Sequence, residues 1–206
     1  MPVKSGFHII ALSLLIGLLP ISAADQGDWN LLISKLPKST TIQAAFNEVR
    51  TSPLRKRPSV LSGTLRYSVD HGLSLHYKEP LERIIFIQGD SIELRDDEGG
   101  RRTLPDDERY AWIPDLIGAI FSFDLDRWKD SFELRSFTEQ EGIWEAYLEP
   151  KNDSSRDQIR SLTIKGDTTY ISEMLLKMKG GRDVEIRVVD AKTDIVFDEQ
   201  VLGLYF

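Results

Sequence analysis

The sequence predicts a mainly β protein of the α+β class, in which short helices interrupt one antiparallel sheet. Through most of residues 40–190, apolar and polar residues alternate with a period of two, which is typical of strands with one buried face. Short turn motifs separate these segments, so neighbouring strands are expected to pair antiparallel. In the middle of the chain, residues 110–123 are almost wholly apolar and have the spacing of a helix instead.

The N-terminal residues have the pattern of a cleaved secretory signal peptide. Lys4 precedes the uncharged apolar segment 9–19, and small residues lead to Ala24 before the acidic Asp25. This apolar segment is about half as long as a membrane-spanning helix, which needs about 20 residues. Small side chains just before the cut suit signal peptidase. We therefore expect residues 1–24 to be removed and residues 25–206 to form a single soluble domain in the periplasm.

Composition argues against several classes of protein. The sequence has no cysteine, so the fold cannot depend on disulfide bonds and the chain cannot carry the lipid-modified cysteine of a lipoprotein. Its formal net charge is −7. Removal of residues 1–24 takes away Lys4 alone among the charged residues, which leaves 25 basic and 33 acidic residues and a net charge of −8. An acidic surface disfavours binding to nucleic acids and docking on anionic lipid head groups.

The first half of the expected domain begins with a short helix and continues as a meander of strands. Residues 28–36 place apolar side chains on one helical face, and from Thr40 the period becomes two. The expected strands are 40–47, 61–69, 73–77, 83–88 and 92–94. The alternation puts a set of apolar residues on shared faces, and we assign these to the wall of an apolar cavity: Ile42, Phe46, Leu65, Tyr67, Leu73, Leu75 and Tyr77.

The apolar segment 110–123 needs cover on nearly every side if it forms a helix, because it has almost no polar face. Pro114 suits the first turn of such a helix. One interpretation is a plug of ordinary core, and the other is a lid over an apolar cavity that a ligand displaces. The expected lid residues are Trp112, Ile113, Leu116, Ile117, Ile120 and Phe121. A second short helix around 124–130 carries Trp128, and strands follow at 132–137, 143–148, 161–164, 171–178 and 184–189.

From Trp29 to Phe206, the order of these segments resembles the LolA family, periplasmic carriers of outer-membrane lipoproteins. The segments that carry the resemblance are Phe46–Arg50, Ser62–Leu65, Leu73–Pro80, Ile84–Leu94, Pro114–Ala119 and Asp130–Leu134. The resemblance implies an antiparallel half-open β-barrel with a lid of short helices over an apolar cavity. It also implies a carrier that binds the acyl chains of a lipoprotein or lipid-like cargo and moves it toward the outer membrane. The implied partners are an inner-membrane exporter and an outer-membrane acceptor, with a monomeric protein and no cofactor.

The sequence departs from the family at the latch of the lid. The family's Arg-Pro pair, whose arginine holds the lid shut, should fall near Ser68–Asp70, where this chain has neither residue. Leu75 stands where the next strand usually has tryptophan. These differences favour a divergent branch of the family, and analogy with the family implies for it another lipid-like cargo beside an efflux-type exporter.

The sequence does not favour an enzyme. Beyond residue 24 it has two histidines, His71 and His76, whose spacing in a strand would place them on opposite faces, and a turn at residues 70–72 is expected between them. We therefore expect solvated turn and strand residues here and not metal ligands. The sequence has no nucleophile elbow, P-loop or dinucleotide-binding motif.

Two further functional classes stay open. One is a lipid- or lipoprotein-sensing module, although the known sensors of this fold have an additional C-terminal domain for which this chain is too short. The other is a small outer-membrane β-barrel, because Leu202–Phe206 has apolar residues at a period of two and ends in phenylalanine. The short strands and the helical segment 110–130 disfavour a barrel, whose spans need about 9–11 residues each.

Overall fold

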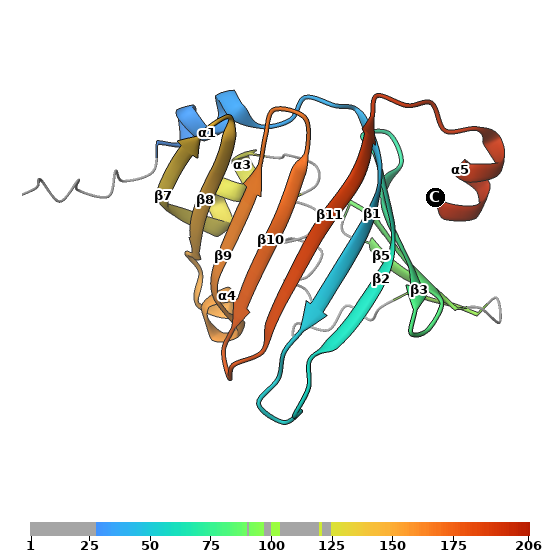
Figure 1. The fold of residues 1–206 in the computed structure, drawn as a ribbon, viewed down its shortest axis with the longest axis horizontal. Helices are drawn as coiled ribbons and strands as arrows, with labels where there is room; N and C mark the ends of the chain where they lie inside the picture. The colour runs from blue at the N-terminus through green and yellow to red at the C-terminus, as the bar shows by residue number, and fades with distance from the viewer. Residues whose placement is uncertain (1–27, 90, 97–99, 104–119, 121–124) are drawn as a thin grey trace, which may run out of the picture.

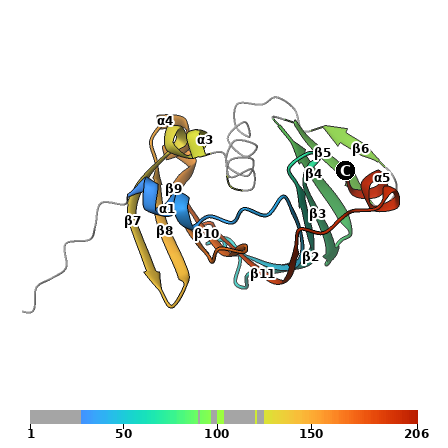
Figure 2. The ribbon, with the colours of Figure 1, turned by 90° about the horizontal axis from the view of Figure 1, so that it is seen from above.

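The computed structural model describes residues 28–89, 91–96, 100–103, 120 and 125–206. Within these residues, eleven antiparallel strands form one sheet in the order β6-β5-β4-β3-β2-β1-β11-β10-β9-β8-β7. Among the described strands, β6 and β7 are the two outermost and do not pair with each other, and Figures 1 and 2 show the sheet bending around a concave side. This is the mainly β, half-open barrel that the sequence predicted. The predicted signal peptide lies outside the described residues.

The predicted strands are all present, and their bounds differ from the predicted ones by a few residues. The strands are β1 (Thr41–Arg50), β2 (Ser59–Ser68), β3 (Gly72–Glu79), β4 (Arg83–Gln88), β5 (Ser91–Asp96), β6 (Arg101–Thr103), β7 (Phe132–Gln140), β8 (Ile143–Pro150), β9 (Ile159–Gly166), β10 (Ile171–Met178) and β11 (Asp183–Thr193). The helices are α1 (Trp29–Lys35), α3 (Leu125–Ser131), α4 (Asp153–Gln158) and α5 (Glu199–Tyr205).

One long-range pairing joins the two halves of the sheet. β1 pairs with β2, its neighbour in sequence, and with β11, which lies near the other end of the chain. Phe46 of β1 stands in register with Gly63 on one side and with Val188 on the other. β1 therefore lies in the middle of the sheet, and strands β2–β6 and β7–β11 form its two wings (Figure 2).

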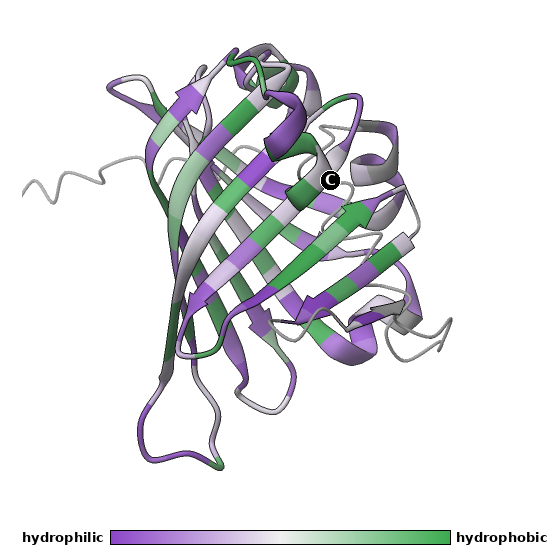
Figure 3. Cartoon of the chain, turned by 90° about the vertical axis from the view of Figure 1, so that its right-hand side faces the viewer, coloured by the Kyte–Doolittle hydropathy of each residue, from purple (hydrophilic) through white to green (hydrophobic). Residues whose placement is uncertain are grey.

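The period-two pattern corresponds to the two faces of the sheet. Ala44, Leu65 and Leu75 stand in register across β1, β2 and β3, and all three are buried on the concave side. Hydrophobic and hydrophilic residues alternate along the strands in Figure 3. Two tryptophans fill the core at the other wing, since Trp128 of α3 and Trp144 of β8 are each 1% exposed. The face that the sequence analysis assigned to the interior is therefore the concave one.

Gly63 allows two aromatic rings to pack across β2. A Cβ atom at this position would lie 2.2 Å from the main-chain oxygen of His76 and 2.9 Å from Cε1 of Phe46. The rings of Phe46 and Tyr77 lie edge to face, with centroids 5.1 Å apart and planes at 87°. A side chain at position 63 would occupy the space through which this contact is made.

Replacement of Gly63 by alanine is expected to lower the free energy of unfolding by about 1–3 kcal/mol, because the added methyl group must displace main-chain atoms. Urea unfolding measures this difference. The matched control is Gly203→Ala in α5, where nothing lies within 4 Å of the added Cβ and alanine favours the helix. An equal or smaller loss at Gly63 than at Gly203 would contradict the close packing described here.

Residues 202–205 belong to helix α5 and Phe206 caps its end, so these residues do not form the strand that their period-two pattern suggested. Asp198 caps α5 by accepting a hydrogen bond from the main-chain nitrogen of Val201. Aspartate at this position satisfies a free N–H group of the first turn and favours a helix. The period-two pattern of apolar residues in this segment therefore does not indicate a strand.

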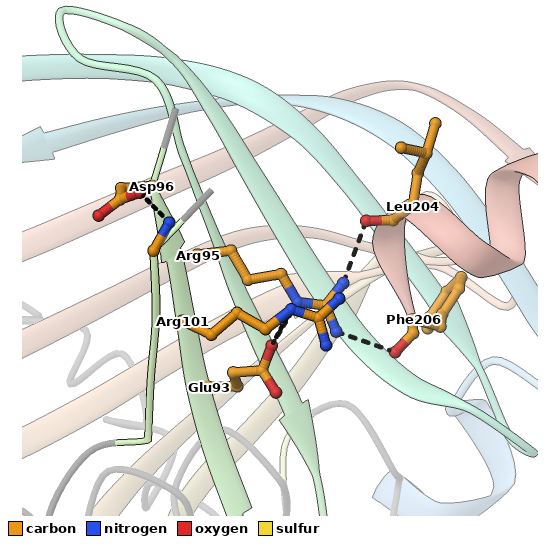
Figure 4. A network of polar contacts seen from close by, with 7 residues as sticks. Glu93, Arg95, Asp96, Arg101, Leu204 and Phe206 are labelled. Carbon is orange, nitrogen blue, oxygen red and sulfur yellow. Dashed lines mark hydrogen bonds and ion pairs between the residues drawn. The ribbon is translucent and has the colours of Figure 1, made fainter. Parts of the chain in front are cut away.

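Helix α5 lies against the outer, convex face of strands β2–β5 (Figure 2). The guanidinium carbon of Arg66 lies 3.6 Å from the centre of the Tyr205 ring. Arg95 donates hydrogen bonds to the main-chain oxygens of Leu204 at 3.1 Å and Phe206 at 3.2 Å (Figure 4). These contacts attach α5 to the side of the sheet away from the concave face.

His71 and His76 both contact this helix region, which differs from the prediction of two solvated residues on opposite faces. The His76 ring lies 5.3 Å from the ring of Tyr205, and the His71 ring lies 5.7 Å from that of Phe206. His76 is 8% exposed. The turn expected between the two histidines is present, with Gly72 at φ 99°, but the sequence did not predict α5, whose end packs against both rings.

Candidate functional site

A cleft of about 800 Å³ lies on the concave side of the sheet. Small-molecule sites are typically about 300–1,000 Å³, so the cleft has the size of a binding site. Both wings contribute to its walls. The apolar lining residues are Leu61, Leu75, Pro80, Leu81, Ile85, Ile87, Ile92, Leu94, Ile120, Leu162, Met174, Leu176, Met178, Val184 and Ile186.

The wall on the β7–β11 wing is continuous because alternate residues of adjacent strands stand in register. Leu176 of β10 is opposite Leu162 of β9 and Val184 of β11. Met174 is opposite Ile186 of β11 in the same way. Since each strand turns every second side chain toward the concave face, these five residues form one apolar surface.

The opposite wall is built in the same way from strands β3, β4 and β5. Ile85 of β4 stands between Leu75 of β3 and Leu94 of β5, and Ile87 stands opposite Ile92. Ile85 and Leu94 are only half-buried, although both point toward the concave side. When a ligand covers apolar side chains that are partly accessible inside a cleft, apolar surface is removed from water and binding becomes more favourable.

One end of the cleft is charged. It lies where β1 and β3 finish and where β4 and β11 begin, so the antiparallel pairing gathers residues from strand ends that are distant in sequence. Four arginines and two acids line this end: Arg50, Arg55, Arg83, Arg182, Glu48 and Asp183. The cleft is therefore amphipathic, with apolar walls and a charged end that carries more positive than negative groups.

Glu48 is a buried carboxylate at this charged end. It is 2% exposed, and its Oε2 atom accepts a hydrogen bond of 2.6 Å from the Tyr77 hydroxyl. Its Oε1 atom accepts a hydrogen bond from Nε of Arg50. Burial and the nearby charge of Glu48 raise the pKa of Tyr77. Burial opposes the charge on Arg50, but its hydrogen bond and ion pair with Glu48 outweigh that effect and raise the pKa of Arg50.

Replacement of Tyr77 by phenylalanine is expected to lower the free energy of unfolding by about 1–3 kcal/mol, because it leaves a buried carboxylate oxygen without its donor. Chemical unfolding at neutral pH measures the loss. The matched control is Tyr147→Phe, since the hydroxyl of Tyr147 makes a longer contact of 3.3 Å to Glu149 in a part-buried position. An equal loss in both variants would contradict the role assigned to the buried pair.

Tyr77 should also make the free energy of unfolding depend on pH, and the sign of this dependence follows from the raised pKa of Tyr77. The folded protein keeps the Tyr77 phenol protonated at pH values where the unfolded chain ionises it, above about pH 10. The folded state then binds more protons than the unfolded state, so stability falls as the pH rises through this range. In the Tyr77→Phe variant, the free energy of unfolding, measured by urea unfolding at a series of pH values, should decrease less over this range than in the unmodified protein.

Two of the seven residues assigned to the cavity wall, Leu75 and Tyr77, line the cleft. The others share the concave face but are buried in the core, away from the cleft lining: Ile42, Phe46, Leu65, Tyr67 and Leu73. The cleft begins nearer the end of β1 that carries Arg50, whereas Tyr67 and Leu73 lie near the opposite end of β2 and β3. Binding of lipid by any of these residues stays a prediction.

Of the residues assigned to the lid, Ile120 is described by the structure. It is 3% exposed and lines the cleft. The other residues of the predicted lid lie outside the described residues: Trp112, Ile113, Leu116, Ile117 and Phe121. The displacement of a lid by a ligand therefore stays a prediction.

The sequence analysis missed the wall formed by β9, β10 and β11 and the charged end of the cleft. The signal for the wall was present in Met174, Leu176 and Met178, which alternate with polar or outward residues. The sequence did not show that β1 pairs with β11. This pairing brings the wing that contains β10 opposite the predicted wall. The arginines gave no signal, because Arg50, Arg83 and Arg182 are separate charges at strand ends and Arg55 lies in a basic loop, so nothing local shows that they meet.

The described residues give no sign of a metal centre or of a membrane-spanning helix. No group of three or more His, Asp or Glu side chains among them is placed to hold a metal ion. Every helix in the described ranges falls short of the length and apolar character needed to cross a bilayer.

The chain was compared with known families, curated proteins and solved structures. No family model and no curated protein matches it. It is similar to a structure from Vibrio parahaemolyticus described as an outer membrane lipoprotein-sorting protein domain, with 11% identity, 79% of this chain and 89% of that chain covered, and a TM-score of 0.48. A LolA superfamily protein from Nitrosomonas europaea has 9% identity, coverages of 81% and 91%, and a TM-score of 0.46. A DUF1329 family protein from Desulfovibrio piger has 11% identity, coverages of 80% and 90%, and a TM-score of 0.46.

These likenesses are weak, since every TM-score is below 0.5 and no identity exceeds 11%. The function proposed below therefore rests on the cleft and not on them.

Proposed function

We propose that the protein is a periplasmic carrier that binds the acyl chains of a lipoprotein or lipid-like cargo in the concave cleft and moves this cargo toward the outer membrane. The observation that supports the proposal is the cleft of about 800 Å³ with apolar walls from both wings of the sheet. Exposing an acyl chain to water costs about 0.8 kcal/mol for each methylene group. A chain enclosed between these walls can cross an aqueous compartment without that cost.

The accessibility of the walls suits reversible binding. Leu94, Leu176, Val184 and Ile186 line the cleft and are half-buried in the absence of a ligand. They therefore offer apolar surface that a bound chain covers, and covering this surface is what gives affinity. A fully packed core would offer no such surface, because protein interiors leave few voids larger than a water molecule.

The remaining parts of the proposal follow from the sequence. Residues 1–24 are removed on secretion, and residues 25–206 act in the periplasm as a monomer without a cofactor. The cargo is received from an inner-membrane exporter and passed to an outer-membrane acceptor. The Arg-Pro pair of the LolA family is missing near Ser68–Asp70, so the exchange uses other contacts than that latch.

Native mass spectrometry of the protein released by osmotic shock, followed by lipid extraction, tests this function. The proposal expects a population of protein with bound acyl-containing molecules, which organic extraction removes. The stripped protein should take up added palmitate. A protein that emerges free of lipid and takes up none of the added palmitate would overturn the proposal and leave the cleft as an unfilled feature of the fold.

Transfer distinguishes a carrier from a sensing module that binds the same ligand. Protein loaded with a fluorescent lysophospholipid is mixed with acceptor vesicles and then separated from them. A carrier passes a large part of its ligand to the vesicles, whereas retention of the ligand on the protein would favour the sensor and contradict the transport step.

A further inference from the structure

Resting on the function proposed above, we propose that the cleft selects an amphiphile with an anionic head group. Arg83, assisted by Arg182, binds the carboxylate or phosphate of the head at the charged end of the cleft. The acyl chain then lies along the apolar walls. This names the chemical class of the cargo and two residues that recognise it.

Arg83 is placed to bind an anion, and it makes no ion pair with an acid among the described residues, although Asp96 stands opposite it on β5. It begins β4, lines the cleft, and its guanidinium carbon lies 4.8 Å from the centre of the Tyr77 ring. Its Nε atom is buried and has no hydrogen-bond partner. A buried N–H group without an acceptor is unfavourable, so a ligand oxygen that accepts from it stabilises the complex.

The acidic residues at this end of the cleft do not neutralise its excess of positive charge. Glu48 is already the acceptor for Tyr77 and Arg50, so it does not neutralise Arg83. Arg182 also lines the cleft and makes no ion pair within the described part of the chain. The acidic net charge of the whole chain therefore coexists with a locally cationic site. A single anionic head group is attracted here even though the overall surface repels an anionic membrane.

The position of Arg83 also fits the direction of an acyl chain. Ile85 lies two residues further along β4, so its side chain points to the same face as that of Arg83. Ile85 stands opposite Leu75 and Leu94, which line the apolar part of the cleft. A head group held by Arg83 therefore places the first methylenes of its chain against these residues. Arginine suits this role because its planar guanidinium binds carboxylate or phosphate through two parallel hydrogen bonds.

The test measures binding of three amphiphiles that share a palmitoyl chain, each used below its micelle concentration. Palmitate carries a carboxylate, lysophosphatidylglycerol an anionic phosphodiester, and lysophosphatidylcholine a phosphodiester balanced by a cation. We expect the anionic phospholipid or palmitate to bind at least about tenfold more tightly than the choline lipid, because charge-assisted hydrogen bonds form with the anionic head. Whichever of the two binds more tightly identifies the head group as phosphate or carboxylate.

Arg83→Gln and Arg182→Gln are expected to weaken binding of the anionic ligand and to leave binding of the choline lipid within about twofold. The matched control is Arg187→Gln, which removes the same charge from the outer face of β11, where Arg187 is 63% exposed and pairs with Glu173 and Glu185. Arg187→Gln should leave unchanged the ratio of the affinity for the anionic ligand to the affinity for the choline lipid.

The outcomes separate this inference from the proposed function. Equal binding of all three ligands to the unmodified protein overturns head-group selection but supports the apolar carrier. An equal change of the ratio in Arg83→Gln and Arg187→Gln also overturns it, since a nonspecific charge effect then explains the selection. Failure of all three ligands to bind overturns the proposed function itself.

Discussion

Replacing Leu176 by aspartate is expected to weaken binding of palmitoyl ligands at least tenfold, which corresponds to about 1.4 kcal/mol. Leu176 lies in the apolar wall between Leu162 and Val184 and is half-buried without a ligand. A carboxylate at this position can stay hydrated in the empty cleft, so the sheet should fold. A bound acyl chain would remove that hydration, which is strongly unfavourable for a charged group. Titration of stripped protein with a fluorescent palmitate analogue measures the loss.

The neighbouring residue provides the control for this prediction. Leu175 is also half-buried, but it points to the outer face of β10, where it stands opposite Thr163 and Glu185. Leu175→Asp introduces the same charge one position away and should keep the affinity of the unmodified protein. Equal loss of binding in the two variants would show that the strand as a whole was disturbed and would contradict a ligand site on the concave face.

Replacing Trp144 by alanine is expected to lower the free energy of unfolding by about 3–5 kcal/mol. Trp144 is 1% exposed, and its indole nitrogen donates a 2.9 Å hydrogen bond to the main-chain oxygen of Asp167. The substitution leaves a large cavity between β8 and β9 and removes the donor from that oxygen. Chemical unfolding followed by circular dichroism measures the change.

Trp144 also separates stability from binding, because it does not line the cleft. At temperatures where Trp144→Ala remains folded, its affinity for palmitate should match that of the unmodified protein. The matched control for stability is Ile143→Ala, since Ile143 is 49% exposed on the same strand and should cost less than about 1 kcal/mol. A stability loss at Trp144 as small as that at Ile143 would contradict its place in the core.

The strands and their faces could be predicted from the sequence because both follow from local periodicity. Residues 61–77 show this well, since Leu65 and Leu75 alternate with polar residues and stand side by side on the concave face. The helix with Trp128 was predicted as well, and it is present as α3. Three short elements were not predicted: β6, α4, which Asn152 caps, and α5.

Pairing between distant strands and contacts of single side chains could not be predicted. Nothing in the local pattern shows that β1 pairs with β11, yet this pairing gives the cleft its second wall. The helical character of α5 depends on the cap at Asp198, while the apolar alternation that follows suggested a strand. In the sequence, Arg83 looks like an ordinary charged residue at the end of a strand. Its contact with Tyr77 and the lack of a hydrogen-bond partner for its Nε atom are found only in the structure.

Photo-crosslinking with a palmitate analogue that carries a diazirine at the end of its chain is the most direct test of an acyl-binding cleft. Bound ligand is irradiated, and the modified residues are identified by peptide mass spectrometry. The proposed site predicts adducts on the apolar walls, at residues such as Leu162, Met174 and Leu176, and their loss in Leu176→Asp. Adducts confined to the convex face around Tyr205, or an unchanged pattern in Leu176→Asp, would contradict it.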